Sequence, residues 1–352
     1  MKSDVMFQTP RLLALKTAVP PHVLDQKDVR VRAGHLFRGR ADIERLLPVF
    51  ENTGIARRYS CVPIDWYTEP HGWADRTQLY IENSVALFEK IACECLEAAR
   101  LSTGDIDAIV TVSTTGIATP SLDALLVERM GLRRNIQRLP VFGLGCAGGV
   151  IGLARAASLA KAAPGSRVLL LVAELCGLTF RKDDFSKSNI VAAALFGDGA
   201  AGAILSTRGS GPALGAHGEH TWPGSLDIMG WDVQEDGLKA LFSQSIPSLV
   251  SRDFRAVTLN FLRENDVALS SIDAFACHPG GAKVLDALED AFQLDRGALA
   301  DSRSVLHDYG NMSAVTVLFV LERMLARGLP ARTLMTTLGP GFTAAFQVIE
   351  NS

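Results

Sequence analysis

Three residues of this chain, a cysteine, a histidine and an asparagine, stand in local sequences that favour chemistry. Cys146 lies in the glycine-rich segment Phe142–Val150. Glycine permits a tight turn and the close approach of a substrate. A helix that follows directly would lower the pKa of the thiol with its positive N-terminal end. We therefore predict a nucleophile at Cys146 and assign no chemistry to the other five cysteines.

His278 ends the apolar run Phe275–Cys277 and is followed by Pro279-Gly280-Gly281. A histidine placed there can pair with a thiolate and donate a hydrogen bond to a thioester carbonyl. Asn311 is either a helix N-cap or a neutral amide donor to an oxyanion or enolate. The three residues together can perform acyl transfer and stabilise a carbanion formed by decarboxylation. A papain-like cysteine protease uses the same residue types, although its flanking motifs do not resemble these.

The elements that must position these residues recur along the chain. Ile106-Asp107-Ala108 and Ile272-Asp273-Ala274 are 166 residues apart, and each opens a strand-like run. Gly145-Cys146 and Gly310-Asn311 are 165 apart, as are the strand starts at Arg167 and Arg332. Three pairs in nearly one register predict two related halves. Ligands bind beyond the carboxyl ends of strands in such sheets, so we expect the three residues to share one crevice.

Alternating helix and strand patterns predict an α/β protein, which we divide into residues 1–208, with the cysteine, and residues 209–352, with the histidine and asparagine. Residues 78–100 have helical periodicity, whereas residues 60–80 have little and are expected to form a long excursion or lid. The segment Gly197–Gly202 lacks the context of a dinucleotide-binding loop, and we read it as a turn into a strand.

Composition and charge argue against several classes of protein. The formal net charge is −3 and no block of Lys or Arg occurs, which disfavours nucleic-acid binding as the main activity. No apolar run is long enough to span a bilayer, and no signal peptide is recognisable. Six cysteines in 352 residues do not form a disulfide framework. We expect a cytoplasmic protein without a metal site or a bound cofactor.

Seven segments together resemble the type III polyketide synthases, the chalcone synthase-like branch of the thiolase superfamily. They span nearly the whole chain in order: Arg57-Arg58-Tyr59, Gly145–Gly149, Thr179-Phe180-Arg181, Ala194–Ala201, His278–Gly281, Tyr309–Ser313 and Gly339-Pro340-Gly341. The resemblance implies a homodimer with the duplicated five-layer αβαβα thiolase fold, acting on coenzyme A thioesters. It also implies that Cys146 takes the starter acyl group, while His278 and Asn311 hold the malonyl thioester during decarboxylation.

The same resemblance suggests a substrate pocket. Phe196 matches the family's gatekeeper, and the position of a second aromatic gatekeeper is taken by Ala240. Thr119 matches a position that reaches into the partner subunit's cavity, where plant enzymes carry Met. Arg45 matches a basic residue near the coenzyme A phosphates. The other residues carried over to the pocket are Thr179, Ser313, Gly339, Pro340 and Gly341, whereas Pro48 and Asn52 replace two further basic residues of the family.

Small residues at positions 240 and 119 suggest room for an apolar starter, and residues 50–73 resemble bacterial members of the family. We therefore expect a medium- or long-chain acyl-CoA starter, extension by malonyl-CoA, and an alkylpyrone or alkylresorcinol product. The alternative is a β-ketoacyl-acyl carrier protein synthase III-like enzyme, which performs one condensation with malonyl-acyl carrier protein. A catalytically silent scaffold of the same fold is disfavoured by the retained Cys146, His278 and Asn311.

Overall fold

The computed structural model describes residues 8–40, 42–243 and 245–351, which form an α/β protein around a nine-stranded mixed sheet. Along the sheet the strand order is β11-β12-β13-β8-β1-β7-β6-β4-β5. The strands are β1 (Arg11–Ala18), β4 (Ala108–Val112), β5 (Gln137–Val141), β6 (Arg167–Leu175), β7 (Asp198–Ser206), β8 (Ala213–Thr221), β11 (Ala274–Cys277), β12 (Arg332–Gly339) and β13 (Thr343–Glu350). Two antiparallel pairs lie apart from it, β2 (His22–Asp25) with β3 (Arg57–Ser60) and the hairpin of β9 (Met229–Gln234) with β10 (Gly237–Phe242).

The sheet contains the same arrangement twice. In the first half β4 runs parallel to β6, and β6 antiparallel to β7. In the second half β11 runs parallel to β12, and β12 antiparallel to β13. Asp107 accepts a 2.8 Å hydrogen bond from the backbone N–H of Arg167, and Asp273 accepts one of the same length from Arg332. The repeat predicted from spacing is thus present in the topology and in its side-chain contacts. The predicted boundary at 208/209 falls in the segment 207–212 between β7 and β8.

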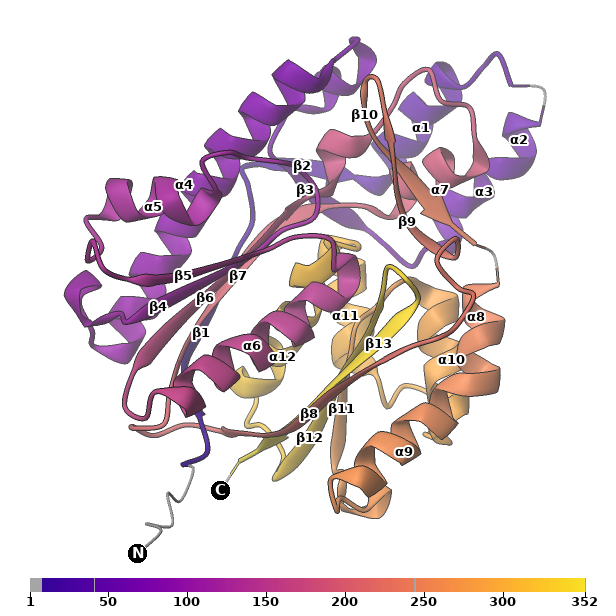
Figure 1. Cartoon of the computed structure of the whole chain (residues 1–352). Coiled ribbons are helices and arrows are strands. Elements are labelled where there is room, and N and C mark those ends of the chain that lie inside the picture. The colour runs from indigo at the N-terminus through magenta and orange to yellow at the C-terminus, as the bar shows by residue number, and fades with distance from the viewer. Residues whose placement is uncertain (1–7, 41, 244, 352) are drawn as a thin grey trace, which may run out of the picture.

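Helices form layers on both sides of each half-sheet, as the predicted fold requires (Figure 1). The two central helices are α6 (Gly148–Ala162) and α12 (Thr316–Ala326), and each packs against strands of both halves. One outer layer is α4 (Trp73–Ala99) with α5 (Leu122–Met130), against the first half. The other contains α9 (Arg255–Glu264) and α10 (Ala282–Phe292), whose apolar side chains cluster with those of β12 and β13. α11 (Ala300–Tyr309) lies against α12.

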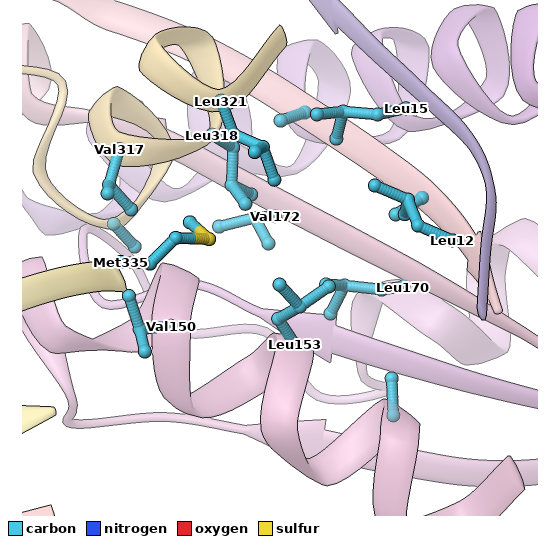
Figure 2. Close-up of a cluster of buried hydrophobic side chains, with 14 of the residues drawn as sticks. Leu12, Leu15, Val150, Leu153, Leu170, Val172, Val317, Leu318, Leu321 and Met335 are labelled. Carbon is cyan, nitrogen blue, oxygen red and sulfur yellow. The ribbon is translucent and has the colours of Figure 1, made fainter. Parts of the chain in front are cut away.

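Strands β4, β6, β7 and β12 are buried along nearly their whole length because both of their faces are covered. In β6, Leu169 and Leu171 belong to the cluster beneath α4, whereas Leu170 and Val172 face the central helices. Figure 2 shows this central cluster, in which Leu170 and Val172 lie near Leu153 of α6 and Leu318 of α12. The central layer therefore fixes the two halves to each other, and the turns that begin α6 and lead into α12 are part of it.

A smaller group of helices packs around an apolar cluster of its own. It consists of α1 (Gln26–Leu36), α2 (Ile43–Leu46), α3 (Pro48–Asn52) and α7 (Lys187–Leu195), which share one apolar cluster. A short helix α8 (Ile246–Leu249) and a π-helical turn (Val250–Phe254) lead into α9. The prediction of an excursion over residues 60–80 is wrong in its second part, because α4 already begins at Trp73. In the described part of the chain, no helix is long and apolar enough to cross a membrane.

Candidate active site

Cys146 lies in a short 3₁₀ turn, Gly145–Ala147, between the end of β5 and the start of α6. The turn requires Gly143 and Gly145 at positive φ, +90° and +46°. Two hydroxyls hold its backbone. Thr337 of β12 donates to the carbonyl of Cys146 at 2.7 Å, and the backbone N–H of Gly145 donates to the Thr114 hydroxyl at 3.0 Å. The nucleophile candidate is thus fixed from both halves of the molecule.

The glycines around Cys146 also let other parts of the protein approach closely. A Cβ at Gly149 would lie 2.2 Å from the carbonyl oxygen of Ala314, and one at Gly145 only 2.5 Å from Cδ of Pro340. A Cβ at Gly339 would lie 2.6 Å from Cβ of Ala147. The segment Gly339-Pro340-Gly341 therefore packs directly against the cysteine turn, while it also serves as the turn between β12 and β13.

His278 follows directly after β11, as its position at the end of an apolar run predicts. Its backbone N–H donates to the carbonyl of Thr336 at 2.9 Å, which continues the pairing with β12. The side chain is 5% exposed, and neither ring nitrogen has a hydrogen-bond partner among the described residues. Burial lowers the pKa of the imidazole to about 3, so the ring is neutral. Two unpaired nitrogens in a buried position leave the imidazole available to a ligand.

Asn311 lies between α11 and a 3₁₀ turn, Ser313–Val315, that leads into α12. Its carboxamide oxygen accepts a 2.8 Å hydrogen bond from the backbone N–H of Ser313, two residues on, which forms an Asx turn. The N-cap interpretation is wrong, because Met312 is the N-cap of this 3₁₀ turn. Its Nδ2 has one long contact, 3.4 Å to the carbonyl of Gly280 beside His278. Because the oxygen is fixed and the nitrogen is loosely bound, the carboxamide presents its donor towards the histidine loop.

The electrostatic setting of Cys146 differs from the prediction. Burial raises the pKa of the thiol to about 12, although the side chains of Ser313 and Asn311 partly oppose this. The predicted lowering by the helix N-terminus does not outweigh the cost of removing a thiolate from water. At neutral pH the thiol of Cys146 is therefore protonated and the imidazole of His278 is neutral.

Glu174 is a buried acid beside the site that sequence analysis missed. It lies in β6 with no exposed surface, and it accepts hydrogen bonds from the backbone N–H of Thr114 at 3.0 Å and from the Ser313 hydroxyl at 3.4 Å. Burial raises its pKa to about 7. A single carboxyl group thereby connects the segments that hold Cys146 and Asn311. The signal in the sequence was an acidic residue within the otherwise apolar run of β6.

The three candidate residues line one cavity of about 560 Å³, which we call the main cavity. This volume lies in the range of small-molecule sites. Much of the wall is apolar, including Val191, Leu195, Met229, Phe242, Ile246, Phe254, Val284, Leu288 and Leu338. Arg45, Lys187 and Lys283 also line it, and no Asp or Glu does among the described residues. In the same described ranges no group of three or more His, Cys, Asp or Glu side chains could hold a metal ion.

A second cavity of about 70 Å³ contains two of the predicted pocket residues. Phe196 and Thr179 line it, together with Phe37, Phe180 and Cys176. Neither of these two predicted residues lines the main cavity, although Phe196 is joined to Asn311 by a backbone bridge. Phe196 therefore lies next to Asn311 and lines the second cavity.

Other predicted pocket residues lie elsewhere. Ala240 lines neither cavity among the described residues, and the room predicted beside it is filled. Trp231, its cross-strand neighbour, lies with its ring 6.0 Å from that of Phe196, and Phe242 lies 5.5 Å from it. Thr119 is exposed and lines neither cavity. Aromatic side chains from neighbouring positions therefore occupy the space beside Ala240.

Comparison with known proteins decides the family. Residues 6–212 match the family model of the N-terminal domain of chalcone and stilbene synthases, and residues 217–349 match that of the C-terminal domain. The chain belongs to the chalcone and stilbene synthase family. It is a type III polyketide synthase, and its activity is of the acyltransferase type.

Relatives of this type III polyketide synthase include 1,3,6,8-tetrahydroxynaphthalene synthase of Streptomyces peucetius subsp. caesius, 36% identical over 99% of this chain and 95% of the relative. The α-pyrone synthesis polyketide synthase-like Pks18 of Mycobacterium tuberculosis is 28% identical over 94% of this chain and 88% of its own length. The crystal structure of 1,3,6,8-tetrahydroxynaphthalene synthase from Streptomyces coelicolor A3(2) superposes with a TM-score of 0.93, covering 97% of this chain and 99% of that chain at 29% identity. The last comparison supports the thiolase-like fold predicted from the sequence.

Proposed function

We propose that this type III polyketide synthase loads an acyl-CoA starter on Cys146 and extends it with malonyl-CoA by decarboxylative condensation. The observation that carries the proposal is that Cys146, His278 and Asn311 line one cavity. These residues are far apart in the sequence, and they meet at this cavity because the two halves pack against each other through the central helices.

The loading step follows from the protonation states. Burial disfavours a free thiolate at Cys146 and an imidazolium at His278 before the reaction begins. The thiol proton therefore passes to His278 at the same time as the sulfur attacks the starter carbonyl. The carbon–sulfur bond to coenzyme A then breaks, the proton leaves with the coenzyme A thiol, and Cys146 holds the acyl group. His278 returns to its neutral form.

The extension step uses the unpaired donors. The bond between the malonyl α-carbon and its carboxylate breaks, carbon dioxide leaves, and the electron pair remains as an enolate on the thioester. A ring N–H of His278 and the carboxamide Nδ2 of Asn311 donate to the enolate oxygen, and neither has a strong competing acceptor. The enolate carbon then attacks the carbonyl carbon of the acyl group on Cys146 and forms the new carbon–carbon bond. The carbon–sulfur bond breaks, and the sulfur of Cys146 leaves as a thiolate.

The charges along the main cavity support a coenzyme A thioester as the ligand. Arg45, Lys187 and Lys283 line it, and Lys187 and Lys283 form no ion pair with a described residue. Phosphates bind well to such cations, and a cavity without acidic side chains does not repel them. Lys187 and Lys283 then compensate for Pro48 and Asn52, which line the same cavity where the family has basic residues. No further resident cofactor is proposed.

The apolar wall supports a medium- or long-chain acyl starter, with an alkylpyrone or alkylresorcinol as the product. The second cavity behind Phe196 offers further apolar space. Similarity to Pks18, whose name refers to α-pyrone synthesis, favours this product class. The higher identity to 1,3,6,8-tetrahydroxynaphthalene synthase favours a second candidate, in which the product is a polyhydroxylated naphthalene and no fatty starter is needed.

We also propose a homodimer. Thr119, the residue expected to reach into a partner's cavity, is exposed. Ile117 and Phe142 are 51% and 57% exposed, and they follow the neighbouring parallel strands β4 and β5. Exposed large apolar side chains at one end of a sheet are typical of an interface.

The test is incubation of the purified protein with malonyl-CoA, alone and with acyl-CoA starters from acetyl to palmitoyl, followed by mass spectrometry. Pyrones or resorcinols that carry the starter support the first candidate. A naphthalene product from malonyl-CoA alone supports the second. Product formation only with malonyl-acyl carrier protein, after one condensation, would overturn both. The Cys146→Ala variant is the control, and continued condensation by it would refute the mechanism.

A further inference from the structure

Arg58 is a buried cation that the proposed reaction does not use. It lies in β3 and is 3% exposed. Among the described residues, it is the only charged side chain that donates hydrogen bonds to the C-terminal end of α7. Its Nη1 donates to the carbonyls of Ala193 and Phe196, both at 2.7 Å. Burial lowers the pKa of the guanidinium to about 10, so the group remains charged at neutral pH. The desolvation of this cation is costly, and the attraction of the buried Asp198 only partly opposes it.

The aliphatic stem of Arg58 lies against a second segment as well. A Cβ at Gly310 would lie 2.7 Å from Cγ and 2.8 Å from Cδ of Arg58, and one at Gly197 would lie 3.4 Å from its Cβ. Gly310 therefore makes space for this side chain, whereas a Cβ at Gly197 would first meet the carbonyl oxygen of Tyr309, at 2.5 Å. The next residue, Tyr59, stacks on Tyr309 with ring centroids 5.6 Å apart.

The two segments that contact Arg58 are joined to each other. The backbone N–H of Asn311 donates to the carbonyl of Leu195 at 2.8 Å, and that of Gly197 donates to the carbonyl of Asn311 at 3.0 Å. This bridge holds Phe196 beside Asn311. Arg58 bonds one side of the bridge through its guanidinium and packs on the other through its stem.

We propose that Arg58 is a positioning residue that sets the carboxamide of Asn311 and the ring of Phe196 at the same time. The inference rests on the proposed role of Asn311 in malonyl decarboxylation. Arginine suits this place because the planar Nη1 directs its two N–H bonds to two carbonyls while the stem fills the space beside Gly310. Lysine would keep the charge but offers a point charge without that fixed geometry.

The experiment compares Arg58→Met and Arg58→Lys with two controls. Arg57→Gln removes the neighbouring exposed arginine, whose described ion pair is with Asp308 at 3.6 Å. Arg76→Met removes another buried arginine that donates to backbone carbonyls, those of His71 and Leu178, without a described contact to Phe196 or Asn311. Starter loading on Cys146 is measured by intact-protein mass spectrometry, and decarboxylation of malonyl-CoA is measured separately.

We expect Arg58→Met to lower decarboxylation by about 100-fold, as a small misplacement of a reacting group can, while starter loading changes little. Arg58→Lys should fall between this variant and the wild type. Both controls should keep the wild-type ratio of decarboxylation to loading. This ratio should hold for Arg76→Met even where that variant unfolds at a lower temperature than the wild type. An equal loss of both steps in Arg58→Met, or the same selective loss in Arg76→Met, would overturn the inference.

A second readout separates this inference from the proposed function. If the wild-type protein neither loads a starter nor decarboxylates malonyl-CoA, the proposed function fails, but the bridge can still be measured. Hydrogen exchange of the peptides that contain Gly197 and Asn311 should speed up in Arg58→Met and not in Arg57→Gln. Unchanged exchange in Arg58→Met would overturn the positioning role.

Discussion

Replacing Glu174 by Gln should change how the stability of this protein depends on pH. The carboxyl group is buried between Thr114 and Ser313, and burial raises its pKa from 4.5 to about 7. Glutamine has nearly the same shape. It can accept from the backbone N–H of Thr114 through its oxygen and donate to the Ser313 hydroxyl through its nitrogen. The substitution therefore removes the titration and keeps the shape of the side chain.

The direction and size of the effect follow from the two pKa values. Below about pH 4.5, Glu174 is protonated in the folded and the unfolded chain, and it adds no pH dependence. Between pH 4.5 and about 7 the unfolded chain releases the proton and the folded chain keeps it, so the free energy of unfolding of the wild type falls. At about 1.4 kcal/mol for each pH unit, the loss reaches about 3 kcal/mol and stays constant above pH 7.

The assay is urea unfolding of the wild type and Glu174→Gln at one protein concentration, from pH 4.5 to 8. The difference in unfolding free energy between the two proteins cancels the other titrating groups. It should shift in favour of Glu174→Gln by about 3 kcal/mol from pH 4.5 to 7 and then level off. A difference that is flat with pH, or that shifts in favour of the wild type, would show that Glu174 is not held protonated by burial.

Three further predictions concern the main cavity and its neighbours. His278→Gln should slow alkylation of Cys146 by iodoacetamide at neutral pH by about 100-fold and raise its apparent pKa, since the base that accepts the thiol proton is lost; an unchanged pH–rate profile would refute this. The double variant Lys187→Ala/Lys283→Ala should raise the KM for malonyl-CoA by about ten-fold, with kcat little changed and Lys90→Ala as the exposed control, because it removes charge-assisted contacts to phosphate. Equal KM values in the two variants would place the phosphates elsewhere. Phe196→Ala should shift preference towards longer acyl-CoA starters in competition assays by opening the second cavity, and an unchanged preference would show that the cavity takes no acyl chain.

The sequence determined the three chemistry-bearing residues and the elements that hold them. Each of Cys146, His278 and Asn311 stands at a boundary where a regular apolar pattern meets glycine, and such boundaries depend on local backbone conformation. The duplication was also readable, because Asp107 with Arg167 and Asp273 with Arg332 keep their spacing along the chain. The start of α4 was misplaced, because residues 73–77 are mostly polar or exposed and carry little apolar periodicity.

The tertiary structure decided the properties that depend on surroundings rather than on neighbours in sequence. The raised pKa of Cys146 and the neutral ring of His278 come from burial by segments of both halves. Lys187 and Lys283 are 96 residues apart, and only folding places them along one cavity. Trp231 fills the space that Ala240 leaves beside Phe196 because β9 pairs with β10. Local sequence sets backbone conformation, whereas desolvation, charge clustering and the filling of space depend on which distant side chains meet.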